Sequence, residues 1–172
     1  MSAIAALLYC TDGERELNLL WQAVAHWRQQ GWRVAGLLNP LDGEGRKIRE
    51  RVCSLTDGRE YEIMYRGDTA AGACLLNPQG LAAASEVMRE ALDAPPDILV
   101  FNKFGHAESE GSGLIDEYAQ AVAQGIAVVS LLQEKYVPEW RAFTDQAGVE
   151  LHDLAGLAAW AADALAHGNS VS

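Results

Sequence analysis

The chain has 172 residues, of which 49% are hydrophobic and 22% charged, and its formal net charge is −11. This acidity excludes binding to a nucleic-acid backbone, which needs a basic face that releases counterions. No apolar run reaches the roughly 20 residues of a membrane span, and residues 1–9 lack the basic start of a secretory signal, so we expect a cytoplasmic protein without membrane insertion.

The first elements predicted along the chain are two strands joined by a helix. Residues 3–9 form a continuous apolar run, which is typical of a strand that is covered on both faces. A helix is predicted over 14–30, capped by Thr11 or Asp12, because its apolar residues recur at helical spacing. A second strand over 32–38 completes a unit of strand, helix and parallel strand.

A hairpin and a helix are predicted in the middle of the chain. A loop rich in Gly, Pro and Asp over 39–45 precedes two strands, at 49–55 and 59–65. An Asp-Gly hairpin signal at 56–58 joins these strands. The helix opens at Pro78, because proline is tolerated in the first helical turn.

The remaining elements continue the alternation of strands and helices. Strands are predicted at 97–101, 126–131 and 149–151, and helices at 111–124, around Trp140 and Phe143, and at 154–166. This alternation predicts one three-layer, Rossmann-like α/β domain over residues 1–168, with a mostly parallel sheet and a β-hairpin insertion. Residues 169–172 are expected to form a frayed tail.

Polar residues and glycines follow the central predicted strand, in the stretch Leu99–Leu114. The carboxyl end of such a strand faces the crevice in which open α/β folds bind ligands. Glycine lets the backbone turn, or approach a ligand, where a Cβ would clash. Ligand contacts are therefore predicted from Asn102, Lys103, Gly105, Glu108, Glu110, Gly111 and Gly113. The alternative is an ordinary loop between strand and helix whose charges are solvated.

The first strand ends in a glycine-bearing turn at 11–13 that has the architecture of a phosphate-binding loop, in which backbone N–H groups at a helix start hold an anion. A working loop needs Gly-Lys-Ser/Thr at the helix start, with lysine for the phosphates and a hydroxyl for Mg²⁺. Arg15, Glu16 and Leu17 stand there instead. The turn is thus an anion site without a metal, or simply a turn with a helix cap.

The end of the central strand departs from the nucleotide hydrolases in a related way. Hydrolases of this architecture place acidic residues there, an aspartate for Mg²⁺ and a glutamate that activates water. Asn102 and Lys103 occupy those positions, so the site would bind an anion through Lys103 and the Gly13 turn but hydrolyse NTP poorly or not at all. Gly105 replaces the aspartate of the guanine-reading Asn-Lys-x-Asp motif, which we therefore discount.

The charged residues of the central stretch have alternative interpretations. Lys103 binds an anion, or it forms a salt bridge to Glu108 or Glu16. Glu108 and Glu110 orient Lys103, bind a cation or begin a helix, where acidic residues are favoured. The last explanation suffices for at least one of the two glutamates.

Segments spread over most of the chain together point to a family. They are Arg33-Val34-Ala35-Gly36, Cys74-Leu75-Leu76-Asn77-Pro78, Asn102-Lys103-Phe104-Gly105 with Glu108, Glu110, Gly111, Gly113 and Leu114, Gly125-Ile126-Ala127-Val128 and Trp140-Arg141-Ala142-Phe143. The combination closely resembles a bacterial family, domain of unknown function 2478. The resemblance implies a fold of the P-loop NTPase type that has lost its Walker residues. It also implies an oxyanion or nucleotide ligand, because members are associated with molybdate transport or molybdenum metabolism. This chain departs from the family pattern after Gly105, where His106 and Ala107 replace a basic and an amide residue.

We predict a binding or regulatory protein for an anionic small ligand, either a nucleotide or an oxyanion such as molybdate or tungstate. A protein partner in molybdenum metabolism is implied by the resemblance. The predicted ligand-binding residues are Thr11, Asp12, Gly13, Arg15, Asn102, Lys103, Gly105, Glu108, Glu110, Gly111 and Gly113, with Cys74 and His106 as further candidates; no metal site, cofactor or catalytic residue is assigned. The alternatives are a nucleotide hydrolase or phosphotransferase with a non-standard site that uses Lys103 and Glu108, and a protein-interaction module with a relic pocket.

Overall fold

A seven-stranded sheet forms the centre of the computed structural model, which describes residues 2–65 and 75–168. The strand order is β4-β3-β2-β7-β8-β1-β9, and the five strands from β2 to β9 in that order are parallel. The bounds are β1 Ile4–Tyr9, β2 Val34–Leu38, β3 Arg51–Ser54, β4 Glu60–Glu62, β7 Ile98–Phe104, β8 Ala127–Gln133 and β9 Val149–Leu151. A separate antiparallel pair joins β5, Met64–Tyr65, to β6, Leu75–Leu76.

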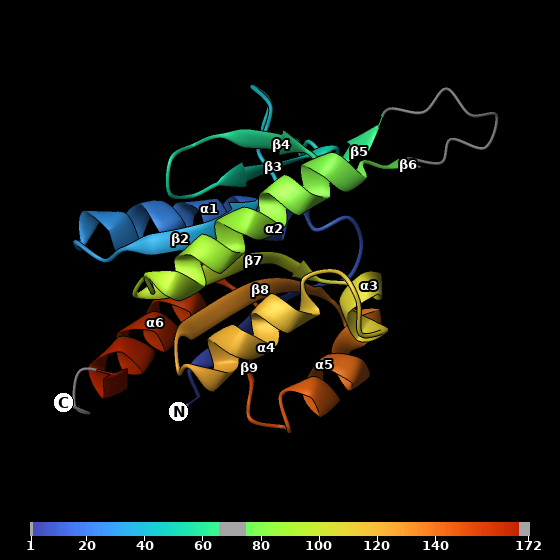
Figure 1. Cartoon of the computed structure of the whole chain (residues 1–172). Helices are drawn as coiled ribbons and strands as arrows, with labels where there is room; N and C mark the ends of the chain where they lie inside the picture. The colour runs from blue at the N-terminus through green and yellow to red at the C-terminus, as the bar shows by residue number, and fades with distance from the viewer. Residues whose placement is uncertain (1, 66–74, 169–172) are drawn as a thin grey trace.

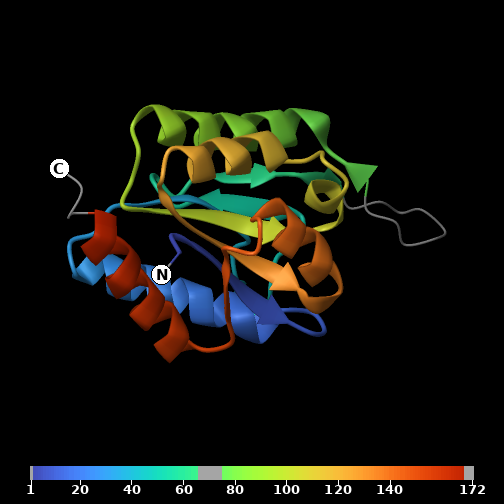
Figure 2. The ribbon, with the colours of Figure 1, turned by 90° about the horizontal axis from the view of Figure 1, so that it is seen from below.

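Helices cover both faces of this sheet, as Figures 1 and 2 show. On one face lie α2 (Pro78–Asp93), α4 (Ile115–Ala123) and α5 (Val137–Phe143), and on the other lie α1 (Glu14–Gln29) and α6 (Leu154–Gly168). Two short helical turns, α3 (His106–Ser109) and η1 (Glu134–Tyr136), follow the ends of β7 and β8. The predicted three-layer α/β architecture with a mostly parallel sheet is confirmed.

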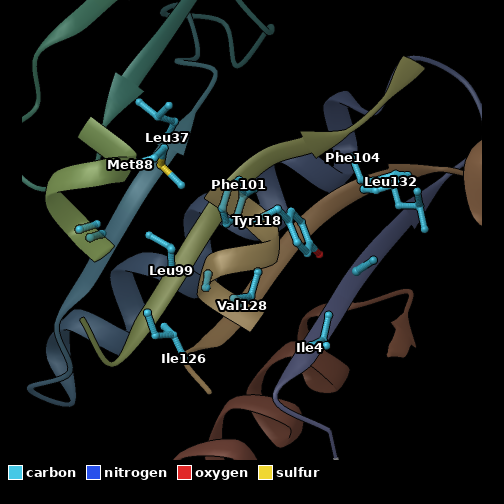
Figure 3. Close-up of a cluster of buried hydrophobic side chains, with 14 of the residues drawn as sticks. Ile4, Leu37, Met88, Leu99, Phe101, Phe104, Tyr118, Ile126, Val128 and Leu132 are labelled. Carbon is cyan, nitrogen blue, oxygen red and sulfur yellow. The ribbon is translucent and has the colours of Figure 1, made fainter. Parts of the chain in front are cut away.

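Two hydrophobic cores, one on each face of the sheet, explain the apolar strands. Along β1, Ile4 and Ala6 belong to the core under α2 and α4, whereas Ala5 and Leu7 belong to the core under α1 and α6. Because both faces are covered, every position of the strand is apolar. Figure 3 shows the first core, in which Tyr118 of α4 lies among the side chains of the central strands.

The first two predicted strands are parallel but are not neighbours in the sheet. Both β7 and β8 lie between β1 and β2, so α1 connects strands that do not pair with each other. The predicted hairpin is confirmed, since β3 and β4 pair antiparallel and Gly58 has a positive φ of 79° in the turn between them. This hairpin extends the sheet beside β2.

Two predicted element boundaries are wrong for identifiable reasons. The strand predicted at 59–65 is divided at Ile63, whose N–H donates to Glu50 while its carbonyl accepts from the N–H of Asn77, so the chain changes partner there. The helix predicted to start at Gly111 begins only at Ile115. The glycines at 111 and 113 have φ of 84° and 64°, which a right-handed helix does not allow.

Candidate functional site

The two predicted ligand loops leave the sheet at the same edge. In register, Leu8 of β1 lies beside Leu132 of β8, which lies beside Phe104 of β7. Only β8 separates the other two strands, so at two strand spacings their carboxyl ends lie about 10 Å apart. Strand β7 continues to Phe104, past the predicted strand end at residue 101, so Asn102 and Lys103 lie in the strand and the loop begins at Gly105. The turn at 11–13 and this loop therefore face the same region beyond the sheet.

The turn that follows β1 is closed by its own side chains. Gly13 is the N-cap of α1 with a φ of 75°, and the Asp12 carboxylate accepts a hydrogen bond from the Glu14 N–H at 2.9 Å. Thr11 is exposed. The Arg15 side chain is 67% exposed and is paired with Glu16 at 2.9 Å, so its charge is already partly balanced.

Lys103 lies exposed at the end of β7, next to the turn that follows it. A Cβ at Gly105 would lie 3.3 Å from both Cδ and Cε of Lys103, so the methylene chain of the lysine covers this glycine. The two carboxylates considered as its structural partners have other contacts, because Glu16 pairs with Arg15 and Glu108 binds backbone N–H groups. Among the described residues, neither carboxylate forms an ion pair with the Lys103 ammonium.

Glu108 holds the loop after β7 in shape. Its Oε1 accepts a hydrogen bond from the Gly105 N–H at 2.9 Å, and its Oε2 accepts one from the Leu114 N–H at 3.1 Å. The carboxylate thus closes the whole turn from one end to the other. By contrast, Glu110 is exposed and faces His106 at 3.5 Å, an arrangement that places both side chains at the surface.

The amide of Asn102 joins β7 to the segment after β2. Its Oδ1 accepts a hydrogen bond from the backbone N–H of Asn39 at 2.8 Å, and the buried Asn39 side chain in turn donates to the Arg51 carbonyl at 2.7 Å. Asn102, which the sequence predicts as a ligand contact, therefore has a structural role: it attaches the 39–50 segment to β7. That segment carries further charged residues.

Sequence reasoning missed two basic residues, Lys47 and Arg49, which lie in the 39–50 segment. The segment covers the start of α1: the Lys47 N–H donates to a Glu14 carboxylate oxygen at 3.3 Å, and the Asn18 side chain donates to the Gly45 carbonyl at 3.1 Å. The Lys47 Nζ donates to the Asp12 carbonyl at 2.5 Å, directly on the turn. The signal in the sequence was a basic run, Arg46 to Arg51, in an otherwise acidic chain.

The electrostatics of this edge link Lys47 to the other cations. Partial burial lowers the pKa of Lys47, and the like charges of Arg49 and Lys103 lower it further, while Asp12 and Glu14 act in the opposite direction. The charges of the turn after β1 and of Lys103 at the end of β7 therefore both affect the pKa of Lys47. The 39–50 segment thus contacts the turn at 11–13 through Lys47 and the end of β7 through Asn39.

Acidic and aromatic groups surround the same edge. Burial raises the pKa of Tyr9 at the end of β1, where Tyr136 and Glu16 also raise it and Arg49 lowers it. A hydrogen bond to Glu134 is the main reason that the pKa of the exposed Cys10 thiol is raised. Acidic groups thus lie near the same end of the sheet as Lys47, Arg49 and Lys103.

The described parts of the chain contain no group of three or more His, Cys, Asp or Glu side chains arranged to hold a metal ion. Cys74, a candidate from the sequence, lies outside the described residues. Within 2–65 and 75–168, none of the helices combines the length and the apolar character that crossing a membrane requires.

A groove of about 660 Å³ lies elsewhere, between α2 and the β3–β4 hairpin. Val34 and Ala35 of β2 line it together with Leu55 and Val87, and its rim carries both arginine and glutamate side chains. The predicted site residues are not among those that line it, so this groove is separate from the candidate site.

Two solved structures are similar to this chain. A human cancer-related nucleoside triphosphatase matches with a TM-score of 0.67 and 16% identity, covering 98% of each chain. THEP1 from Aquifex aeolicus matches with a TM-score of 0.56 and 17% identity, over 87% of this chain and 88% of that one. These likenesses show that the chain shares the α/β fold of these two proteins.

One relative was identified by its sequence. The molybdenum import ATP-binding protein ModC 2 of Bradyrhizobium diazoefficiens is 35% identical over 150 residues, which are 86% of this chain. The match spans only 17% of the length of that relative. A family model described as protein of unknown function (DUF2478) matches residues 4–160. The chain belongs to the DUF2478 family.

Proposed function

We propose that this protein is a binding or regulatory protein that holds an anionic small ligand between the turn at 11–13 and the loop at 102–113. The observation that carries the proposal is the exposed Lys103 ammonium, which shares its electrostatic environment with Lys47 while Lys47 contacts the Asp12 carbonyl. A compact anion seated there would contact positive charge from two sides and the amino terminus of α1. A nucleotide phosphate and a tetrahedral oxyanion such as molybdate both have this character.

The residues at the two strand ends favour binding over hydrolysis. The start of α1 carries Glu16 and Leu17 where a hydrolase would need lysine and a hydroxyl, and the end of β7 carries Asn102 and Lys103 where it would need acids. The amide of Asn102 is also engaged by Asn39, so its oxygen already has a structural partner. This set of groups supports the proposal of binding without turnover.

The comparison with ModC 2 supports a role in molybdenum metabolism. That protein is named for molybdenum import and ATP binding, and the 150 matched residues are a small part of it. We propose that the present protein works beside such an import system in the cytoplasm, as a sensor or partner of its ATP-binding protein. The bound anion would then report the supply of molybdate or the state of the nucleotide.

Isothermal titration calorimetry with molybdate, tungstate, sulfate, inorganic phosphate, ATP and ADP tests the proposal. We expect saturable binding of at least one of these anions, weakened at least tenfold by Lys103→Ala. Arg59→Ala is the matched control, since it removes one positive charge from a 78% exposed side chain in the β3–β4 hairpin, and we expect it to leave affinity within twofold. No binding of any anion, equal binding by Lys103→Ala, or steady phosphate release from ATP would overturn the proposal.

A further inference from the structure

The 39–50 segment is built as a small hairpin that holds Lys47 in place. Leu41 and Lys47 form an isolated antiparallel bridge, and the Asp42 N–H donates to the Arg46 carbonyl at 2.8 Å. The Asp42 carboxylate also accepts a hydrogen bond from the Arg46 N–H at 2.9 Å, which closes the tip. A side chain that is held in this way loses little further freedom when it binds a ligand.

The turn after β1 has helix-terminal N–H groups but lacks a cation of its own. Arg15 is exposed and paired with Glu16, and the Asp12 carboxylate occupies the Glu14 N–H. Lys47 of the 39–50 segment contacts this turn. Its ammonium has three hydrogens and donates one of them to the Asp12 carbonyl. The hydrogens that remain are available to an acceptor beside the start of α1.

We infer that Lys47 is a ligand-binding residue, and that from the 39–50 segment it supplies the positive charge which the turn after β1 lacks. The inference rests on the proposed function and names the residues of that site. Lys47 contacts the turn directly, whereas Arg49 and Lys103 act on Lys47 through their charges. The ligand lies between Lys47 and Lys103, above the end of β8.

The chemistry of the site selects a compact anion of high charge, such as a phosphate group or a tetrahedral oxyanion. The positive charges of Arg49 and Lys103 both act on Lys47, which also contacts the turn after β1, and an anion placed beside the Lys47 ammonium offsets that repulsion. The carboxylates of Asp12 and Glu14 offset part of the charge at Lys47, so a singly charged anion would gain little. Free inorganic phosphate, molybdate and the terminal phosphate of a nucleotide share this chemistry.

The site is held together by one structural connection. The 39–50 segment is bound to β7 through Asn39 and Asn102, and to α1 through Asn18 and Glu14. The hairpin therefore spans the distance between the two loops that carry the other ligand contacts. Its position at the site depends on the folded chain and not on a contiguous sequence motif.

Calorimetric titration of the full chain with molybdate, inorganic phosphate and metal-free ATP tests this inference. Lys47→Met keeps the apolar stem of the side chain and removes its charge, and we expect it to weaken the best of these ligands at least tenfold. Arg46→Met is the matched control, because it removes the same charge from the same hairpin at a side chain that is 71% exposed and paired with Glu44. We expect the control to bind within twofold of the unchanged chain.

The outcomes separate this inference from the proposed function. If the unchanged chain and Lys47→Met bind equally well while Lys103→Ala does not, the role of Lys47 is overturned and the proposed function stands. If the unchanged chain binds none of the three probes, this inference is overturned; if tungstate, sulfate and ADP also fail to bind, the proposed function is overturned with it. Should Lys47→Met unfold, acetylation of the unchanged chain followed by mass spectrometry decides: saturating ligand should protect Lys47, and equal modification with and without ligand would overturn the inference.

Discussion

The side chain of Asn102 accepts a hydrogen bond from the backbone N–H of Asn39 at 2.8 Å, and through this contact the end of β7 holds the segment that carries Lys47. Asn39 is buried, and its own side chain donates to the Arg51 carbonyl at 2.7 Å. Two adjacent residues of β7 therefore serve different purposes: Asn102 attaches the 39–50 segment, and Lys103 exposes its side chain.

Asn102→Ala should lower the free energy of unfolding by about 1–3 kcal/mol, because it leaves the buried Asn39 N–H without an acceptor. Anion binding should weaken as well, since the hairpin with Lys47 loses its attachment to β7. Urea denaturation and calorimetry measure the two effects. Asn102→Asp keeps an acceptor oxygen and should retain most of the stability; an Asn102→Ala protein as stable as the unchanged chain would contradict the structural role.

Glu108→Ala should cost about 1–2 kcal/mol of stability, because two backbone N–H groups, those of Gly105 and Leu114, lose their acceptor. Glu110→Ala is the matched variant: it removes the same charge from an exposed side chain in the same turn, and we expect a change under about 0.5 kcal/mol. The midpoint of urea unfolding measures both variants. Equal effects of the two substitutions would show that the carboxylate of Glu108 does not close the turn.

Gly113→Ala should be more destabilising than Gly111→Ala. Both glycines have positive φ, 64° and 84°, which costs an alanine about 1 kcal/mol. Only at Gly113 does a Cβ collide, 2.0 Å from the Glu108 Oε2, whereas nothing lies within 4 Å of one at Gly111. Thermal unfolding of the two variants gives the order, and an equal loss would mean that the Glu108 carboxylate moves aside without cost.

Protons should be taken up when an anion binds at alkaline pH. The pKa of Lys47 is lowered by burial and by two like charges, and a bound anion raises it again, so a fraction of Lys47 becomes protonated on binding. The window lies between the lowered pKa and the ordinary pKa of lysine. Calorimetry in buffers of different ionisation enthalpy measures the uptake, which should vanish in Lys47→Met.

The same shift has a definite sign in the stability of the free protein. Below the lowered pKa, Lys47 is charged in the folded and unfolded chain, and the cost of holding that charge in the fold is fully present. As pH rises through the lowered pKa towards the ordinary one, the folded state releases its proton first and this cost disappears. Any stability that Lys47→Met gains over the unchanged chain should therefore shrink in this alkaline window. A difference that is independent of pH across the window would contradict this assignment.

Local patterns in the sequence predicted the layers of this fold, while the arrangement of its strands needed contacts that no pattern contains. The apolar run of β1 and the Asp-Gly turn at Gly58 are local features, and both predictions were confirmed. The insertion of β7 and β8 between β1 and β2 depends on the pairing of Val34 with Ile98, 64 residues away, and of Ile4 with Val128, 124 residues away, which periodicity cannot describe.

In the candidate site, too, local features could be predicted from the sequence, whereas contacts between distant segments could not. The position of Lys103 follows from a rule about strand ends, so it could be predicted, although its ligand remains a proposal. Lys47 could not be placed, because its partners Asp12 and Glu14 are more than 30 residues away along the chain. The carboxylate of Glu108 was considered for cation binding, for orienting Lys103 and for helix initiation; the hydrogen bond that it accepts from Gly105 supports the last of these.

The order of the strands also constrains how the chain can assemble. The neighbours of β1 are residues 127–133 and 149–151, so β1 has no partner strand in this sheet until more than 100 further residues have been synthesised. Until then its apolar faces remain exposed in a nascent chain, a state that favours chaperone binding and aggregation. Because such distant pairing must precede a complete sheet, refolding should be slow for a chain of this length.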